Sequence, residues 1–120
     1  MRKLVVSLAL VTVVGLMAPS HAAINVAVAA PGGDVAGYAT PTVVLIKGAP
    51  ANFFNADPLA PHDIVSDERR NNQHIFRSAV SSGPGEGLKP ITGVENLDIG
   101  TYGFHCSIHI NMQGTLDVRA

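Results

Sequence analysis

The apolar residues after about residue 24 fall in short runs that Gly, Pro and polar residues separate. The runs occupy 26–29, 42–46, 64–65, 75–76 and 115–118. No segment after the N-terminal region repeats apolar residues at helical spacing. Short strands with regular turn signals are typical of a β-sandwich or barrel. The pattern therefore predicts an all-β domain, in which the polar, mixed-charge segment 67–73 is a solvated connection and the Gly/Pro-rich segment 81–87 is a flexible loop.

The N-terminal segment has a different pattern. A basic head, Met1–Lys3, precedes an apolar run over Leu4–Ala18, and a proline and small residues follow it. This order is typical of a secretory signal peptide, and the apolar run of about 15 residues is shorter than the ~20 that span a bilayer. We expect residues 1–22 to be a cleaved signal peptide and residues 23–120 to form one exported domain, in the periplasm or outside the cell.

Composition and charge exclude some functions. Once residues 1–22 are removed, six Lys and Arg remain against nine Asp and Glu, a net charge of −3. No basic patch or stripe is present, so the sequence does not indicate a nucleic-acid-binding protein. We expect a monomer with no stable membrane insertion after signal cleavage.

The chain has one cysteine, Cys106. Thiols of exported proteins usually form disulfides, so an unpaired cysteine indicates intermolecular pairing, a free reactive thiol or a metal ligand. Alternation along the preceding strand places Tyr102, Phe104 and Cys106 on one face and His105 on the other. The run Leu-x-x-Gly-x-Tyr that ends at Tyr102 predicts the tyrosine corner of Greek-key sandwiches. Cys106 is thus expected on the core side, where its strand ends.

The residues after this cysteine form a ligand pattern. Two residues separate Cys106 from His109, and two more separate His109 from Met112. Thiolate and thioether are soft ligands that select copper, and imidazole suits both copper and zinc. A short loop does not easily supply a second imidazole, so we expect it from another strand, and His62, which follows Pro61, is the best candidate. Two imidazoles, one thiolate and a long axial Met form a blue-copper electron-transfer site.

Each proposed ligand has a structural alternative. Cys106 could be an inert buried thiol, because free cysteine packs as a small hydrophobic residue. His62 and His109 could be surface residues, and Met112 could serve packing alone. We assign no ligand role to His74, which lies beyond a polar segment, or to His105, which points away from Cys106.

The ligand segments resemble those of the cupredoxin family, which includes plastocyanin and amicyanin. The segment Cys106–Met112 has the short spacing of amicyanin, and the segments 53–58, 61–65 and 114–118 resemble the first-ligand region and the closing strand. The resemblance implies a Greek-key two-sheet β-sandwich with one copper ion at one end.

The sequence departs from the cupredoxin pattern at two places. Asp63 stands where relatives commonly have Asn, and a carboxylate there could accept hydrogen bonds from Ser107.

The second departure is that Ile108 and Ile110 replace the prolines that flank the second histidine ligand of amicyanin. We expect this loop to form an apolar surface around His109, together with residues 59–61, at which redox partner proteins dock weakly.

The sequence therefore indicates a non-enzymatic blue-copper protein that carries single electrons. A multicopper enzyme would need further ligands, and the five histidines include no pair two positions apart. A hydrolase that uses Cys106 and His109 would leave His62 and Met112 unexplained. An exported protein that sequesters or delivers copper would use the same four ligands, so this alternative remains open.

Overall fold

The computed structural model describes residues 25–120. The predicted signal peptide, residues 1–22, lies outside the described residues. Among the residues that are described, no helix is long and apolar enough to cross a membrane.

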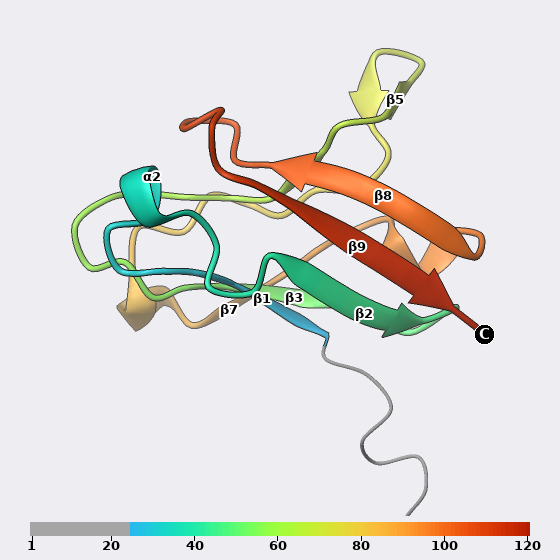
Figure 1. The fold of residues 1–120 in the computed structure, drawn as a ribbon, viewed down its shortest axis with the longest axis horizontal. Coiled ribbons are helices and arrows are strands. Elements are labelled where there is room, and N and C mark those ends of the chain that lie inside the picture. The colour runs from blue at the N-terminus through green and yellow to red at the C-terminus, as the bar shows by residue number, and fades with distance from the viewer. Residues whose placement is uncertain (1–24) are drawn as a thin grey trace, which may run out of the picture.

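Two mixed β-sheets pack face to face (Figure 1). The first has the strand order β1-β3-β7 and the second the order β2-β9-β8-β4. Strands β1 and β3 are parallel, as are β2 and β9, and the other neighbouring pairs are antiparallel. The strand bounds are β1 Val26–Ala29, β2 Thr42–Ile46, β3 Asn52–Asn55, β4 Val65–Ser66, β7 Leu88–Pro90, β8 Gly100–His105 and β9 Gln113–Arg119. The two-sheet β-sandwich that the sequence predicts is confirmed.

Helical structure in the described residues is limited to single turns. These are α2 Gly33–Ala36 and the 3-10 turns η3 Pro84–Glu86 and η4 Val94–Asn96. The turn α2 lies at the end of the sandwich where β8 ends and β9 begins (Figure 1). The loop that carries the predicted ligands Cys106, His109 and Met112 lies at this end, between β8 and β9.

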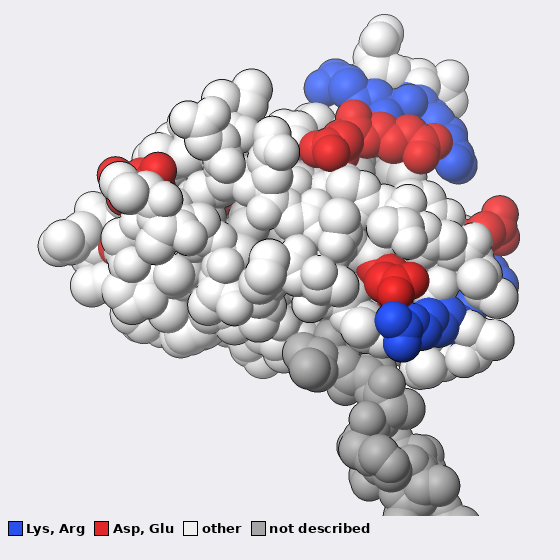
Figure 2. All heavy atoms as spheres, in the orientation of Figure 1, with Lys and Arg blue, Asp and Glu red and all other residues white. Residues whose placement is uncertain are grey.

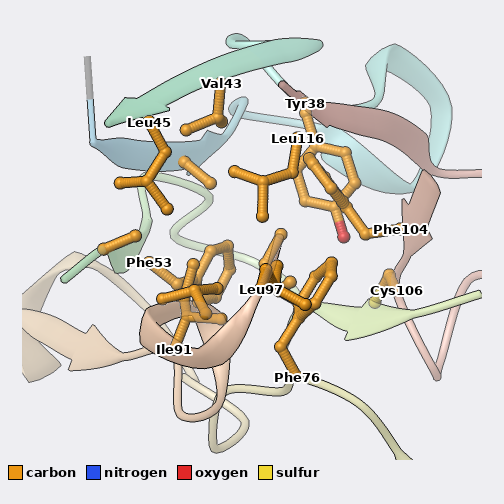
Figure 3. Close-up of a cluster of buried hydrophobic side chains, with 14 of the residues drawn as sticks. Tyr38, Val43, Leu45, Phe53, Phe76, Ile91, Leu97, Phe104, Cys106 and Leu116 are labelled. Atoms are coloured by element: carbon orange, nitrogen blue, oxygen red, sulfur yellow. The ribbon is translucent and has the colours of Figure 1, made fainter. Parts of the chain in front are cut away.

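The core lies between the sheets (Figure 3). Strand alternation sends every second side chain inward, so that β2 buries Val43 and Leu45 while β9 buries Leu116 and Val118. In β1 the alanines point inward and the valines are partly exposed. Small side chains on that face leave room for the large rings of the core, and Phe53 is fully buried.

The predicted tyrosine corner is present at the start of β8. The Tyr102 hydroxyl donates a hydrogen bond to the Asp98 carbonyl oxygen at 2.8 Å. This bond fixes the direction in which the chain enters β8, and the strand then ends directly before Cys106.

The segment 67–73 differs from its predicted form as a simple connection. Strands β5 Arg69–Arg70 and β6 Gln73–His74 pair as an antiparallel hairpin that projects from the sandwich (Figure 1). Its two turn residues, Asn71 and Asn72, have φ values of 54° and 62°. Two-residue hairpin turns of type I′ need positive φ at both positions, and Asn tolerates that conformation. The Asn71-Asn72 pair therefore indicates a hairpin turn, which was not recognised because the whole segment 67–73 is polar.

Candidate metal centre

Three predicted ligands meet at one point of the structure. The Cys106 Sγ lies 3.9 Å from the Nδ1 of His62 and 3.9 Å from the Nδ1 of His109. The three candidate ligand atoms all lie within 4.8 Å of one another. Three ligands that surround an ion in a plane at roughly 2.0–2.3 Å stand roughly 3.5–4.0 Å apart. The spacing of these three side chains therefore fits a single metal ion of that size.

The loop between β8 and β9 presents two of these ligands. Cys106 follows the last residue of β8, and its backbone N–H donates to the Met112 carbonyl at 3.1 Å. The Met112 N–H donates to the His109 carbonyl at 2.8 Å. These two bonds close the loop on itself, so Cys106 and His109 point to the same place.

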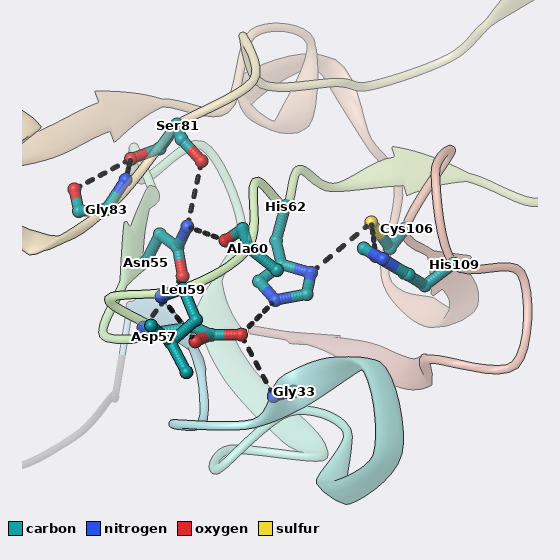
Figure 4. A network of polar contacts seen from close by, with 10 residues as sticks. All are labelled: Gly33, Asn55, Asp57, Leu59, Ala60, His62, Ser81, Gly83, Cys106 and His109. Atoms are coloured by element: carbon teal, nitrogen blue, oxygen red, sulfur yellow. Dashed lines mark hydrogen bonds and ion pairs between the residues drawn. The ribbon is translucent and has the colours of Figure 1, made fainter.

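His62 comes from a different part of the chain and is fixed by its backbone. It exchanges two hydrogen bonds with Ser81, at 3.0 and 2.9 Å. The Asn55 side chain, which is fully buried, donates to the carbonyls of Ser81 and Ala60 (Figure 4). The strand that carries Asn55 thereby holds the first-ligand loop in place.

The His62 ring is held on its far side by a carboxylate. Its Nδ1 faces Cys106, and its Nε2 lies 2.8 Å from Oδ2 of Asp57, with both side chains buried (Figure 4). The hydrogen bond with His62 lowers the pKa of Asp57 to about 2, so this carboxyl is ionised at neutral pH. Sequence reasoning assigned no role to Asp57. Its local signal is an Asx turn, in which the carboxylate accepts the N–H of Leu59 across Pro58.

Met112 lies at the same end of the sandwich and is 1% exposed. A Cβ atom added at Gly33 would stand 3.3 Å from the Met112 methyl and 3.1 Å from Nε2 of His62. A glycine at this position thus lets α2 lie against the two side chains without displacing either of them. The role of Met112 as axial ligand stays a prediction.

The second carboxylate, Asp63, joins the two ligand loops. It accepts hydrogen bonds from the backbone N–H of Ser107 at 2.7 Å and from the Ser107 hydroxyl at 2.6 Å. The predicted contact between these residues is confirmed. The Tyr38 hydroxyl also donates to the Asp63 carbonyl at 2.6 Å, and burial raises the pKa of Tyr38, which keeps the phenol a neutral donor. Sequence reasoning missed Tyr38, since its partner lies 25 residues away.

The other two histidines of the described region do not join the cluster, as predicted. His105 binds the Asp67 carboxylate through Nδ1 at 2.6 Å. His74 donates from Nδ1 to the Ser66 carbonyl at 2.6 Å. Both rings lie on the hairpin side of β8, away from Cys106.

Comparisons with solved structures agree with this arrangement. A purple cupredoxin from Nitrosopumilus maritimus matches with a TM-score of 0.61 and 21% identity, over 78% of this chain and 98% of the other. Amicyanin from Paracoccus versutus matches with a TM-score of 0.59 and 20% identity, over 80% and 81% of the two chains. A point mutant of amicyanin with Cu(I) matches with a TM-score of 0.59 and 19% identity, over 80% and 82%. No family model matches the chain, and no curated protein sequence matches it.

The chain has the cupredoxin fold. The resemblance inferred from the ligand segments is confirmed at the level of the fold, and the His62–Cys106–His109 cluster has the ligand atoms of a type 1 copper site. Copper suits this set because thiolate is a soft ligand and imidazole accompanies it well.

The surroundings of Cys106 distinguish between an intermolecular disulfide, a reactive thiol and a metal ligand. The Cys106 side chain is fully buried, so it is not available for an intermolecular disulfide. Burial also raises the pKa of the Cys106 thiol. A thiol that is protonated and inaccessible makes a poor nucleophile, whereas a bound cation would stabilise the thiolate. An inert thiol would also be buried, but it would not need the Nδ1 atoms of His62 and His109 each 3.9 Å from its sulfur, so the metal-ligand interpretation fits these surroundings best.

The ligand loop of the cupredoxin fold is exposed on its outer side. Ile108 is 46% exposed, Ile110 is 70% exposed and Leu59 is 90% exposed. The His109 side chain between the two isoleucines is partly exposed as well. In the view of Figure 2, Lys and Arg gather over the hairpin and at the far end of the molecule, and the part that carries α2 shows neither. The predicted apolar residues therefore reach solvent at the end of the molecule that holds the cluster.

Proposed function

We propose that the protein is a small exported blue-copper electron carrier. The observation that supports this most directly is the triangle of one sulfur and two ring nitrogens, of which the Cys106 and His62 side chains are buried and the His109 ring is partly exposed. His62, Cys106 and His109 would hold one copper ion, with Met112 at the axial position. Bound copper would supply a couple that takes up and releases one electron, Cu(II)/Cu(I).

The residues around the ligands favour electron transfer because they keep the ligands fixed. Asp57 holds the His62 ring, and Asp63 holds the Cys106–Met112 loop through Ser107. A ligand set that moves little between two oxidation states adds little to the barrier for electron transfer. Burial of Cys106 and His62 keeps bulk water away from the ligand atoms.

The same burial favours a carrier over a protein that delivers copper. Handing an ion to an acceptor requires ligands that the acceptor can reach, and here only the His109 ring is partly exposed. We propose no enzymatic reaction, since the five histidines include no pair two positions apart that would hold the second copper site of a multicopper enzyme.

The first prediction tests this function on the protein without residues 1–22. Addition of Cu(II) should produce an intense visible band from thiolate-to-copper charge transfer, which saturates at one copper per chain. Ascorbate should bleach the band, and ferricyanide should restore it with copper retained. Absorption spectroscopy with copper analysis after gel filtration makes the measurement. Copper that binds without the band, or that leaves with a mild chelator faster than it exchanges electrons, would contradict the proposal.

The second prediction concerns docking at the apolar surface around His109. Electron self-exchange between two copies of the copper protein is the probe, measured by NMR line broadening in mixed Cu(I) and Cu(II) samples. Ile108→Lys should slow self-exchange by about tenfold, because it replaces an apolar contact and places like charges opposite each other. Tenfold corresponds to about 1.4 kcal/mol, which is the size of effect expected for a residue near the centre of an interface rather than at its rim.

Ile99→Lys is the matched control. Ile99 is 58% exposed and precedes β8 at the end of the strand opposite Cys106, roughly 20 Å away at ~3.3 Å per residue. Its replacement should leave self-exchange unchanged. Equal rates in Ile108→Lys and the unmodified protein would exclude this docking surface.

A further inference from the structure

The Asp57 carboxylate is the feature of the site that copper ligation alone does not explain. We propose that Asp57 is a positioning residue that fixes the His62 ring with Nδ1 toward the metal, and that its buried charge stabilises the oxidised over the reduced site. This inference rests on the proposed copper site and goes beyond it, since it sets the direction in which the site's reduction potential is shifted.

The first step is the hydrogen-bond pattern of the carboxylate. Asp57 receives the N–H of Gly33 at 3.2 Å, the N–H of Leu59 at 2.9 Å and Nε2 of His62 at 2.8 Å (Figure 4). An ionised carboxylate only accepts hydrogen bonds. The ring hydrogen of His62 must therefore sit on Nε2, which leaves the lone pair of Nδ1 free on the side of Cys106. Carboxylates that bind a metal-ligating histidine in this way fix its tautomer and its ring orientation.

The second step is that Asp57 is itself immobile. Its two backbone donors come from different segments, the start of α2 and the turn after Pro58. The side chain is 1% exposed, so water does not compete for these bonds. The ring orientation of His62 is consequently set before any metal binds.

The third step is the charge at the site. Asp57 and Asp63 are both buried, and no Lys or Arg of the described residues forms an ion pair with either. With the Cys106 thiolate, three negative charges would stand at or beside the ligands of one bound copper ion. The site then carries one net negative charge with Cu(II) and two with Cu(I), after one electron arrives from a reduced partner. Buried charges are screened weakly, so each carboxylate disfavours the reduced form.

The experiment compares midpoint potentials of the copper-loaded protein with those of three variants. Asp57→Asn retains an oxygen that accepts the His62 hydrogen bond but removes the charge. At the midpoint potential of the unmodified protein, its Cu(I):Cu(II) ratio should rise at least tenfold, which corresponds to ~59 mV. Asp63→Asn should change the ratio in the same direction. Asp98→Asn removes an equal charge that is 94% exposed, and it should leave the ratio unchanged.

A second measurement tests positioning without copper. Long-range ¹H–¹⁵N NMR of the metal-free protein should show His62 protonated at Nε2 and bare at Nδ1. Asp57→Ala should give a mixture of tautomers and bind Cu(II) about 10–100-fold more weakly, the usual loss for such a partner of a ligand. Asp57→Asn should retain the single tautomer.

The outcomes separate this inference from the proposed function. Absence of the visible band in the unmodified protein would contradict the copper carrier. The NMR measurement on the metal-free protein would still test the positioning role of Asp57. His62 protonated at Nδ1 in the unmodified protein would overturn the positioning role, even if Asp57→Ala fails to fold. Blue Asp57→Asn protein with the same midpoint potential as Asp98→Asn would overturn the role of the charge.

Discussion

Cys106→Ser should abolish the visible band completely. The band needs a thiolate, and a serine hydroxyl is a hard, weakly acidic donor that does not replace it. The substitution changes one buried atom, and the backbone bond from residue 106 to the Met112 carbonyl does not involve the side chain. We therefore expect the fold to persist, with a stability loss of about 1–3 kcal/mol if the buried hydroxyl finds no partner. Cu(II) titration followed by absorption spectroscopy, with thermal unfolding monitored by circular dichroism, makes both measurements.

His105→Ala is the control for this prediction. His105 is the neighbour of Cys106 in the chain, but its ring binds Asp67 on the opposite side of β8. Its removal should leave the band and its one-to-one copper saturation unchanged. A band that survives in Cys106→Ser, or one that disappears in His105→Ala from a folded protein, would contradict the assignment of the thiolate.

Local sequence was sufficient where a feature depends on neighbours in the chain. The predicted strand Thr42–Ile46 has the same bounds as β2, because apolar β-branched residues lie between two breakers. The tyrosine corner needs only the four-residue separation of Asp98 and Tyr102. Cys106 and His109 likewise meet through one short loop, so their spacing alone predicted that they lie together.

The supporting contacts of the site that the sequence did not predict join segments far apart in the chain. The Gly33–Asp57 bond joins residues 24 apart, and the Tyr38–Asp63 bond joins residues 25 apart. No periodicity or composition links such pairs. His62 was found despite a separation of 44 residues from Cys106 because copper chemistry required a second imidazole. Chemistry constrained the ligands, but it did not constrain the residues that support them.

Strand ends were also harder to predict than strands. The run at 64–65 appears as β4 one residue later, over Val65–Ser66, and the run at 75–76 contributes to the core without belonging to a named strand. Phe76 is nevertheless buried, and the next residue, Arg77, pairs through single bridges with Val65 and Thr92. Burial was thus predictable from the apolar run, whereas hydrogen-bond pairing depended on its distant partners.

Gly93→Ala should cause the largest loss of stability among the glycine substitutions we consider. Gly93 has φ +100°, and a Cβ atom there would collide with the Ile75 carbonyl oxygen and lie 3.2 Å from the Phe76 Cα. Left-handed backbone costs about 1–2 kcal/mol for a residue with a side chain, and overpacking costs about 1–3 kcal/mol more. The atoms in the way are backbone atoms beside a buried Phe76 ring, so they have little freedom to move. We expect a total loss of about 2–5 kcal/mol, a large part of the stability of a small domain.

Gly48→Ala separates the two contributions to this loss. Gly48 also has a positive φ, +86°, but nothing lies within 4 Å of the added Cβ. Only the backbone contribution of about 1–2 kcal/mol should appear. Thermal unfolding of the metal-free proteins should therefore place the Tm of Gly93→Ala below that of Gly48→Ala, by roughly 4–8 °C for each further kcal/mol. Equal Tm values would mean that the segment around Ile75 yields to the methyl group, and that the packing of η4 against the core is looser than its contacts indicate.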